Sequence, residues 1–365
     1  MAIEQFHPRD NSQLFGFTSV EEELARGFHS GKLHHSLMLS GAKGIGKATL
    51  AYRFARYIFS GGADLRALET DSFSLFGEPV LSVADTGAEG ALFMPESHGI
   101  FKRVSANSHS DLFSIEPLFD AKKEVYKDEI AAEAARKISD FLSLTPAEAS
   151  HRVVIIDAAD QLNEKAANAL LKSIEEPPAS TFILLICHNP LSILPTLRSR
   201  CRAIKLATPD LNAFGAVLAQ RMPTIDLQQY GALHTLSQGS PGFAITLANF
   251  DAINLYEIVA RHAADKQSLA ATIDLAAELT ASKRPEAWYI SKYILLALIE
   301  RCLNISRVKS QPIYAHEHAD LQVLLTRLGQ QKLFTLRDHI QQLLRDTDTL
   351  NLDKTQAIRL LLSAA

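Results

Sequence analysis

A glycine-rich stretch between two apolar segments carries the residues that could do chemistry. Residues 41–47, GAKGIGK, fit the pattern G-x-x-x-x-G-K. In such a loop the glycines let backbone amides curl around phosphate oxygens, and the lysine supplies a positive charge. The sequence therefore predicts a loop that binds the phosphates of ATP or ADP. Its candidate binding residues are Gly41, Gly44, Ile45, Gly46, Lys47, Ala48 and Thr49.

The residue after the loop lysine departs from this pattern. That place calls for Ser or Thr, whose hydroxyl ligates magnesium, and this chain has Ala48 there. Thr49 follows, but the next residue on a helix is rotated by about 100°, so its hydroxyl should not reach the same site. We expect a loop that holds phosphates but is poorly equipped to hold their metal ion. A glycine-rich turn that binds nothing is the alternative.

A second candidate group follows an apolar run. Residues 153–156, VVII, predict a buried strand that ends in Asp157. In phosphate-loop proteins an aspartate in this position helps to organise magnesium, and active hydrolases follow it with a glutamate that polarises the attacking water. Here the next residue is Ala158. Because alanine can neither accept a proton nor orient water, a second part of the hydrolytic apparatus is missing.

Two further polar groups lie later in the chain. The turn at 188–190, His-Asn-Pro, follows an apolar run and is read either as a sensor of a terminal phosphate or as a plain turn. The segment 197–206, LRSRCRAIKL, has arginines at every second position from 198 to 202. An arginine beside a nucleotide can neutralise charge that develops on the phosphate. A solvated strand edge has the same pattern, and spacing alone favours that interpretation.

The elements that must position these groups follow from the apolar pattern. Residues 37–39 predict a buried strand of the kind found in parallel sheets. Residues 50–58 show helical spacing, which points a helix N-terminus at the bound anion. Helices are also predicted over 129–144 and 163–176, and Asn163 can cap the second of them.

Length and composition bound the class of protein. The 365 residues suffice for roughly two or three domains, and 47% hydrophobic with 21% charged residues is typical of globular chains. A net charge of -4 gives no sign of a dedicated nucleic-acid-binding surface. No apolar run suits a signal peptide or a membrane span, so we expect no membrane association and a cytoplasmic location. The three cysteines form no C-x-x-C pair, so no zinc is expected.

Four motifs carry a resemblance to a known family. GAKGIGK, VVIIDAAD, NALLKSIEEPP and LRSRC, in this order and at these separations, closely resemble the clamp-loader branch of the AAA+ proteins. The match covers most of residues 12–206 with specific motifs, and the rest by helical pattern only. It implies an α/β fold class: an AAA+ RecA-like P-loop domain with a parallel sheet, a small helical lid and an all-α C-terminal collar domain. We place the P-loop domain at 1–206, the helical lid at 207–266 and the collar domain at 267–365. Residues 61–102 form a loop or insertion within the first of these.

The resemblance also implies partners and a role for one arginine. Ser199, Arg200 and Cys201 match the Ser-Arg-Cys motif of the family. Arg200 is therefore expected to act as an arginine finger in the ATP site of a neighbouring gamma or tau subunit. For Arg200 this expectation replaces the solvated strand edge that spacing alone favours. A collar shared with gamma or tau and delta subunits is likewise implied, as is action on a sliding clamp and primed DNA through the complex.

Departures from the family pattern indicate which kind of subunit this is. Subunits that hydrolyse ATP carry Ser or Thr after the loop lysine, Glu after the strand aspartate, a four-cysteine zinc module and a lid arginine in a Gly-Ser-x-Arg context. This chain has Ala48, Ala158, no zinc cysteines and Gly-Ser-Pro-Gly at 239–242. We therefore expect a subunit that binds ATP or ADP without hydrolysis. The alternative is a self-sufficient ATPase that uses Thr49 and Asp157. A P-loop kinase is disfavoured by the lid and the helical tail.

Overall fold

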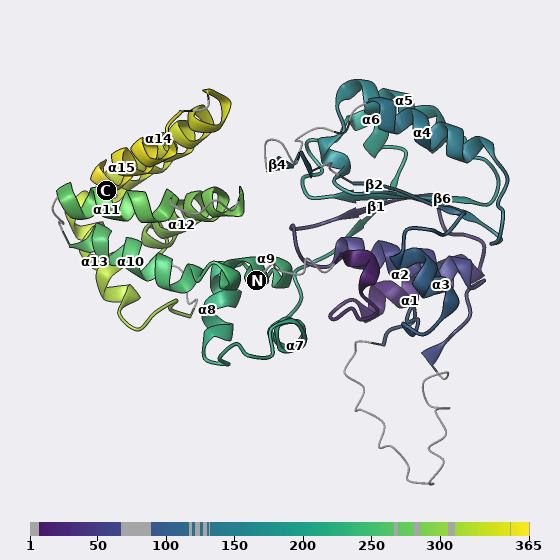
Figure 1. Cartoon of the computed structure of the whole chain (residues 1–365), viewed down its shortest axis with the longest axis horizontal. Coiled ribbons are helices and arrows are strands. Elements are labelled where there is room, and N and C mark those ends of the chain that lie inside the picture. The colour runs from purple at the N-terminus through teal and green to yellow at the C-terminus, as the bar shows by residue number, and fades with distance from the viewer. Residues whose placement is uncertain are drawn as a thin grey trace, which may run out of the picture. The chain divides into compact units, whose positions relative to one another are not determined.

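The computed structural model divides the chain into two compact units, Met1–Ala216 and Val217–Ala365. It describes residues 7–66, 89–116, 119–120, 125–126, 130, 132–265, 269–280, 285–305, 311–350 and 352–364. The first unit is built on a sheet, and the elements described in the second are helices (Figure 1). The candidate site residues all lie in the first unit.

Five parallel strands form the central sheet of the first unit, in the order β2-β5-β6-β1-β7. Their bounds are β1 Ser36–Ser40, β2 Leu112–Ile115, β5 Arg152–Ile156, β6 Thr181–Cys187 and β7 Arg202–Lys205. A short antiparallel pair, β3 (Phe119–Asp120) and β4 (Val125–Tyr126), lies outside this sheet. Because the five strands are parallel, the residues that follow them share one edge, the carboxyl edge, and the residues that precede them share the opposite amino edge.

Helices cover both faces of this sheet (Figure 1). One face carries α1 (Thr18–His29), α2 (Lys47–Phe59) and α3 (Gly99–Ser105), and the other carries α4 (Ala132–Ser143), α5 (Glu164–Glu175) and α6 (Pro195–Arg198). Leu37 and Leu39 of β1 pack into the core with α2, while Met38 packs into the core with α4 and α5. Strands buried on both faces read as unbroken apolar runs, which explains why the sequence predicted them.

The remaining elements of the first unit are short, and the second unit is helical. Two 3-10 turns cover Pro8–Asp10 and Ala159–Gln161, and α7 (Leu211–Arg221) spans the division between the units. The second unit contains α8 Gln229–Leu236, α9 Pro241–Asn249, α10 Ala252–Ala264, α11 Leu269–Thr280, α12 Pro285–Leu303, α13 Glu317–Leu328, α14 Gln330–Leu350 and α15 Lys354–Ala364. Among the described residues no helix on its own has the length and apolarity of a membrane span. The pair α9 and α10 meets that test together, with a bend of 72° between them.

Most predicted elements of the first unit are confirmed. The parallel α/β sheet, the helix after the glycine loop and the helices near 129–144 and 163–176 are all present. The side chain of Asn163 accepts from the amide of Ala166 at 2.9 Å, as expected of a cap. A loop or insertion is predicted over 61–102, but α3 begins at Gly99, and residues 67–88 lie outside the described part of the chain. The domain limits near 206 and 266 stay predictions.

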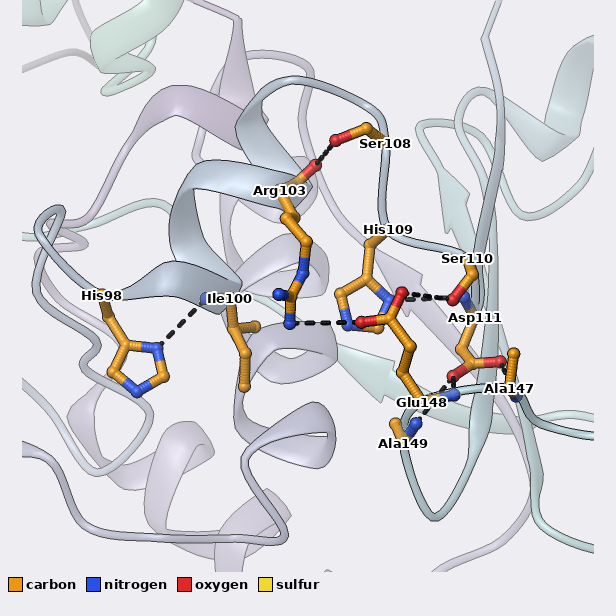
Figure 2. Close-up of polar contacts among 10 residues, drawn as sticks. All are labelled: His98, Ile100, Arg103, Ser108, His109, Ser110, Asp111, Ala147, Glu148 and Ala149. Atoms are coloured by element: carbon orange, nitrogen blue, oxygen red, sulfur yellow. Dashed lines mark hydrogen bonds and ion pairs between the residues drawn. The ribbon is translucent and has the colours of Figure 1, made fainter.

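A buried carboxylate fixes the amino edge of β2 and β5 (Figure 2). Asp111 precedes β2, is fully buried, and accepts from the amides of Ala147, Glu148 and Ala149 at 2.7, 2.8 and 2.7 Å. Burial raises its pKa, but these three donors outweigh it and the pKa lies below the ordinary value. Arg152, the first residue of β5, places Nε 3.9 Å from Asp111. These contacts hold the loop before β5 against the start of β2.

Two buried arginines on α2 hold the N-terminal segment in place. The guanidinium of Arg53 pairs with Glu21 of α1, with Nε to Oε1 at 2.6 Å, and neither side chain is more than 1% exposed. Arg56 donates to the carbonyls of Arg9 and Asn11 at 2.9 and 2.7 Å. Because α2 starts at the glycine loop, these pairs tie the loop helix to residues 9–21.

Candidate functional site

The glycine loop joins β1 to α2 at the carboxyl edge of the sheet. Gly46 is the N-cap of α2, with φ of 104° in the left-handed region that favours glycine, and no side chain caps the helix. A Cβ at Gly41 would lie 2.5 Å from the carbonyl oxygen of Leu206, so only glycine fits there. The uncapped first turn leaves backbone N–H groups and the positive end of the helix dipole facing the loop. This arrangement suits the phosphates of a nucleotide.

The lysine of the loop lies over the loop itself. Lys47 is 3% exposed, and its Nζ donates to the carbonyl oxygens of Gly41 and Ala42 at 2.8 and 2.5 Å. Burial lowers its pKa to about 8, and the nearby carboxylates of Asp157 and Asp160 oppose that shift. The ammonium group therefore keeps most of its charge at neutral pH and has one N–H left for a phosphate oxygen.

The positions after the lysine offer no hydroxyl to a metal. Ala48 packs against the apolar core beneath α2, and Thr49 is 7% exposed on the buried side of the helix. Among the described residues, no cluster of three or more His, Cys, Asp and Glu side chains could hold a metal ion. The loop therefore offers donors to phosphates, and Asp157, directly after β5, is the candidate carboxylate for a metal ion.

Asp157 lies two strands from the glycine loop on the same carboxyl edge. Burial, followed by the negative charge of Glu116, raises its pKa to about 6. Glu116 follows β2 and is held by His7, with Nε2 to Oε2 at 2.8 Å, and by the hydroxyl of Tyr52 on α2, at 2.9 Å to Oε1. Lys47 and the amide of Ala158 act in the opposite direction. The folded chain therefore disfavours the ionised form of Asp157, which lies at the carboxyl edge beside the loop.

Replacing Asp157 with asparagine is expected to stabilise the chain at neutral pH. A carboxyl whose pKa is raised from 3.8 to about 6 by folding destabilises the native state above pH 6, and the cost disappears as pH falls below 4. Two pKa units correspond to about 2–3 kcal/mol. Urea unfolding of Asp157→Asn should therefore show a higher free energy of unfolding than the parent at pH 7.5, and a much smaller difference at pH 4. An equal difference at both pH values would contradict the assignment.

The turn after β6 lies between the loop and Asp157. Both oxygens of Asp160 accept backbone amides of this turn, from His188 and Asn189 at 3.1 Å each. Burial, followed by the charge of Lys47, lowers the pKa of His188 to about 4, so the imidazole is neutral at pH 7. Its Nδ1 is buried without a hydrogen-bond partner in the described chain. The geometry supports a polar group facing the phosphate loop and leaves both sequence interpretations of the turn open.

Arg200 lies at the amino edge of the sheet, away from the loop of its own chain. It follows α6 and precedes β7, whose Arg202 pairs with Leu37 and whose Lys205 pairs with Ser40 of β1. The loop begins after Ser40, so roughly 10 Å of strand separates the two levels before flanking residues are counted. The guanidinium forms an ion pair with Glu175, at the end of α5, and donates to the carbonyl of Thr196 at 2.8 Å.

The three arginines of the segment have separate surroundings. Arg198 donates to the carbonyl of Pro190 at 3.0 Å, and Arg202 pairs with Glu23 of α1 at 2.5 Å. The side chains that flank Arg200 contact α6. Ser199 donates to the carbonyl of Thr196 at 3.1 Å, and the thiol of Cys201 donates to the carbonyl of Leu197 at 3.4 Å. Of the three arginines, only Arg200 contacts both α5, through Glu175, and α6, through Thr196.

Sequence reasoning missed three side chains that shape the site. Glu116 could have been found, because it directly follows a strand that lies next to the strand of Asp157. Asp160 orders the turn after β6 through contacts with residues 28 and 29 positions away, which a local pattern does not express. Glu175 gave no signal, since its contact with Arg200 joins residues 25 positions apart.

The fold and the site together define a P-loop protein of the AAA+ class. A parallel five-stranded sheet carries the glycine loop after β1 and an aspartate after β5, with one strand between them, and a helical region follows. A family model described as "DNA polymerase III, delta subunit" matches residues 96–210. A DNA polymerase III gamma subunit-related protein of Thermotoga maritima covers 94% of this chain and 97% of its own, at 18% identity and a TM-score of 0.43.

Curated relatives narrow the class. The delta' subunit of DNA polymerase III of Escherichia coli is 29% identical over 230 residues, which cover 63% of this chain and 59% of that protein. The delta' subunit of Pseudomonas aeruginosa is 36% identical over 138 residues, which cover 38% of this chain and 40% of that protein. The chain is accordingly similar to the delta' subunits of DNA polymerase III. It spans about half the length of the curated relatives it matches.

Proposed function

We propose that the chain is a non-hydrolysing subunit of the replicative clamp loader. It binds ATP or ADP in its glycine loop without turning it over, and it lends Arg200 to the ATP site of a neighbouring gamma or tau subunit. Together with the delta subunit it helps to couple nucleotide binding to the loading of a sliding clamp on primed DNA. The delta-prime relatives support this role, and the cytoplasmic location stays a prediction.

The position of Arg200 carries the proposal. The glycine loop lies at the carboxyl edge of the sheet, whereas the guanidinium of Arg200 is held at the amino edge by Glu175 and Thr196. An arginine on that side is placed to serve a site in another subunit. A guanidinium suits this task, since it is always charged and offers five N–H donors in a planar fork.

The residues of the loop support nucleotide binding more than hydrolysis. Backbone amides at the start of α2, Lys47 and the turn after β6 would hold the phosphates, and bound nucleotide would supply the charge that Lys47 neutralises. Ala48 removes the metal-binding hydroxyl, and Ala158 removes the carboxylate that would orient water. The methyl group of Ala158 is 4% exposed, so a glutamate could not enter its place without repacking.

A self-sufficient ATPase is the alternative function. It would need Thr49 to replace the missing hydroxyl, and the Thr49 side chain is buried, with 7% exposure. It would also need Asp157 as base, because the next residue is Ala158 in place of a glutamate. The buried Thr49 and the missing glutamate therefore favour binding without hydrolysis over this alternative.

Nucleotide binding by the isolated chain separates these functions. ATP binding should weaken by about 10- to 100-fold in Lys47→Ala, because a charge-assisted hydrogen bond contributes about 1.5–3 kcal/mol. Phosphate release should stay at the background rate in both proteins. Calorimetric titration measures the first and a phosphate-release assay the second. The exposed Lys43→Ala serves as a matched loop control. Turnover that depends on Lys47 would favour the self-sufficient ATPase.

A further inference from the structure

We propose that Glu175 is a positioning residue for Arg200, which it holds in the orientation that a neighbouring ATP site receives. This inference rests on the proposed function, because it assigns a second residue to the same site. Its carboxylate pairs with Nε of Arg200, and the carbonyl of Thr196 accepts from Nη1 at 2.8 Å. The helices α5 and α6, which carry these acceptors, lie side by side over one face of the sheet (Figure 1).

The two contacts leave the outer part of the guanidinium available. Arginine has five N–H groups, one on Nε and two on each terminal nitrogen. Glu175 takes the Nε donor and Thr196 takes one donor of Nη1, so three N–H groups remain. Within the described residues Nη2 donates to no protein atom. A phosphate group takes parallel donors from a guanidinium, and the remaining donors suit that geometry.

The place of Glu175 in its helix is unfavourable without Arg200. Glu175 is the last residue of α5, and the carbonyl groups of a helix C-terminus repel a carboxylate. The same carbonyl groups attract a guanidinium, so Arg200 relieves the repulsion and is itself stabilised. Charge complementarity at this helix end therefore favours one orientation of the Arg200 side chain.

A role in folding stability does not explain this pair. The side chains of Arg200 and Glu175 are 37% and 42% exposed, and ion pairs with such exposure contribute little to stability. A long arginine side chain loses rotamer entropy when it is ordered. Ordering it before the neighbouring subunit arrives moves this cost out of the step in which ATP is hydrolysed.

The test uses the clamp loader reconstituted with gamma or tau and delta subunits. Glu175→Ala should lower the DNA-stimulated rate constant for ATP hydrolysis at the site that Arg200 serves by about tenfold, with KM for ATP, assembly and the melting temperature of the chain unchanged. Glu175→Gln should recover part of the rate, because its amide oxygen still accepts from Nε. Glu176→Ala is the matched control, since Glu176 is the exposed neighbour, and it should have no effect. Glu175→Ala combined with Arg200→Ala should equal Arg200→Ala alone.

The outcomes separate this inference from the proposed function. If Arg200→Ala leaves turnover unchanged, the finger role fails and the role of Glu175 fails with it. If Arg200→Ala impairs turnover and Glu175→Ala does not, only the positioning role is overturned. A faster rate in Glu175→Ala also overturns it, because the carboxylate would then restrain the arginine. If Glu175→Ala also impaired assembly or lowered the melting temperature, Glu175 would have a structural role instead.

Discussion

Replacing Arg200 with alanine is expected to slow ATP hydrolysis by about 10³-fold or more at the site that receives it, in line with the contribution of an arginine finger. In the proposed role the guanidinium stabilises charge that develops on the transferred phosphoryl group, and alanine leaves that charge unpaired. Single-turnover hydrolysis by the DNA-bound, reconstituted complex measures the effect. The fast phase should lose the amplitude of one site, and a slow phase of the same amplitude should appear.

Neighbouring arginines provide the controls for this experiment. Arg202→Ala removes an exposed arginine two residues away that pairs with Glu23, and it should leave the fast phase intact. Arg200→Lys keeps the charge but loses the planar fork, so an intermediate rate is expected. Size-exclusion chromatography should show complete complexes for every variant. Unchanged kinetics in an intact Arg200→Ala complex would contradict the finger role.

Replacing Glu21 with alanine is expected to lower the free energy of unfolding by about 3–5 kcal/mol, the cost of leaving one member of a buried ion pair unpaired. Arg53 loses two contacts, from Nε to Oε1 at 2.6 Å and from Nη2 to Oε2 at 3.1 Å, and its guanidinium remains buried. The amide of Leu92 also loses its acceptor on Glu21, at 3.3 Å. Urea unfolding of the purified chain measures the change.

A matched control distinguishes this pair from a general effect of surface charge. Glu22→Ala removes an exposed carboxylate on the same turn of α1 and should change stability by less than about 0.5 kcal/mol. Glu21→Ala combined with Arg53→Met should recover part of the loss, because no buried charge is left unpaired. A loss below about 1 kcal/mol in Glu21→Ala would show that Arg53 finds another partner or reaches water.

Local patterns predicted the elements that position the site. The runs at 37–39 and 153–156 are buried on both faces of the sheet, so their apolar character is continuous and easily recognised. Asn163 caps α5 through a contact three residues away, which a sequence motif can express. The loop and Asp157 could be placed on one edge because residues that follow parallel strands meet there.

Contacts between distant residues could not be predicted from local patterns. Glu21 and Arg53 are 32 positions apart, and a charged residue in a helix normally indicates a solvated face. The network of His7, Tyr52 and Glu116 joins three segments that only the folded sheet brings together. The helix α3 has seven residues, too few for a clear helical period, and was therefore not predicted.

We propose that the chain holds nucleotide in its own loop without hydrolysing it and acts on ATP in a neighbour. Two variants of this chain, compared in the same reconstituted complex, test both parts of this proposal. Lys47→Ala should leave the DNA-stimulated fast phase of ATP hydrolysis unchanged, and Arg200→Ala should remove the amplitude of one site. The reverse pattern, in which Lys47→Ala removes a phase and Arg200→Ala does not, would contradict the account.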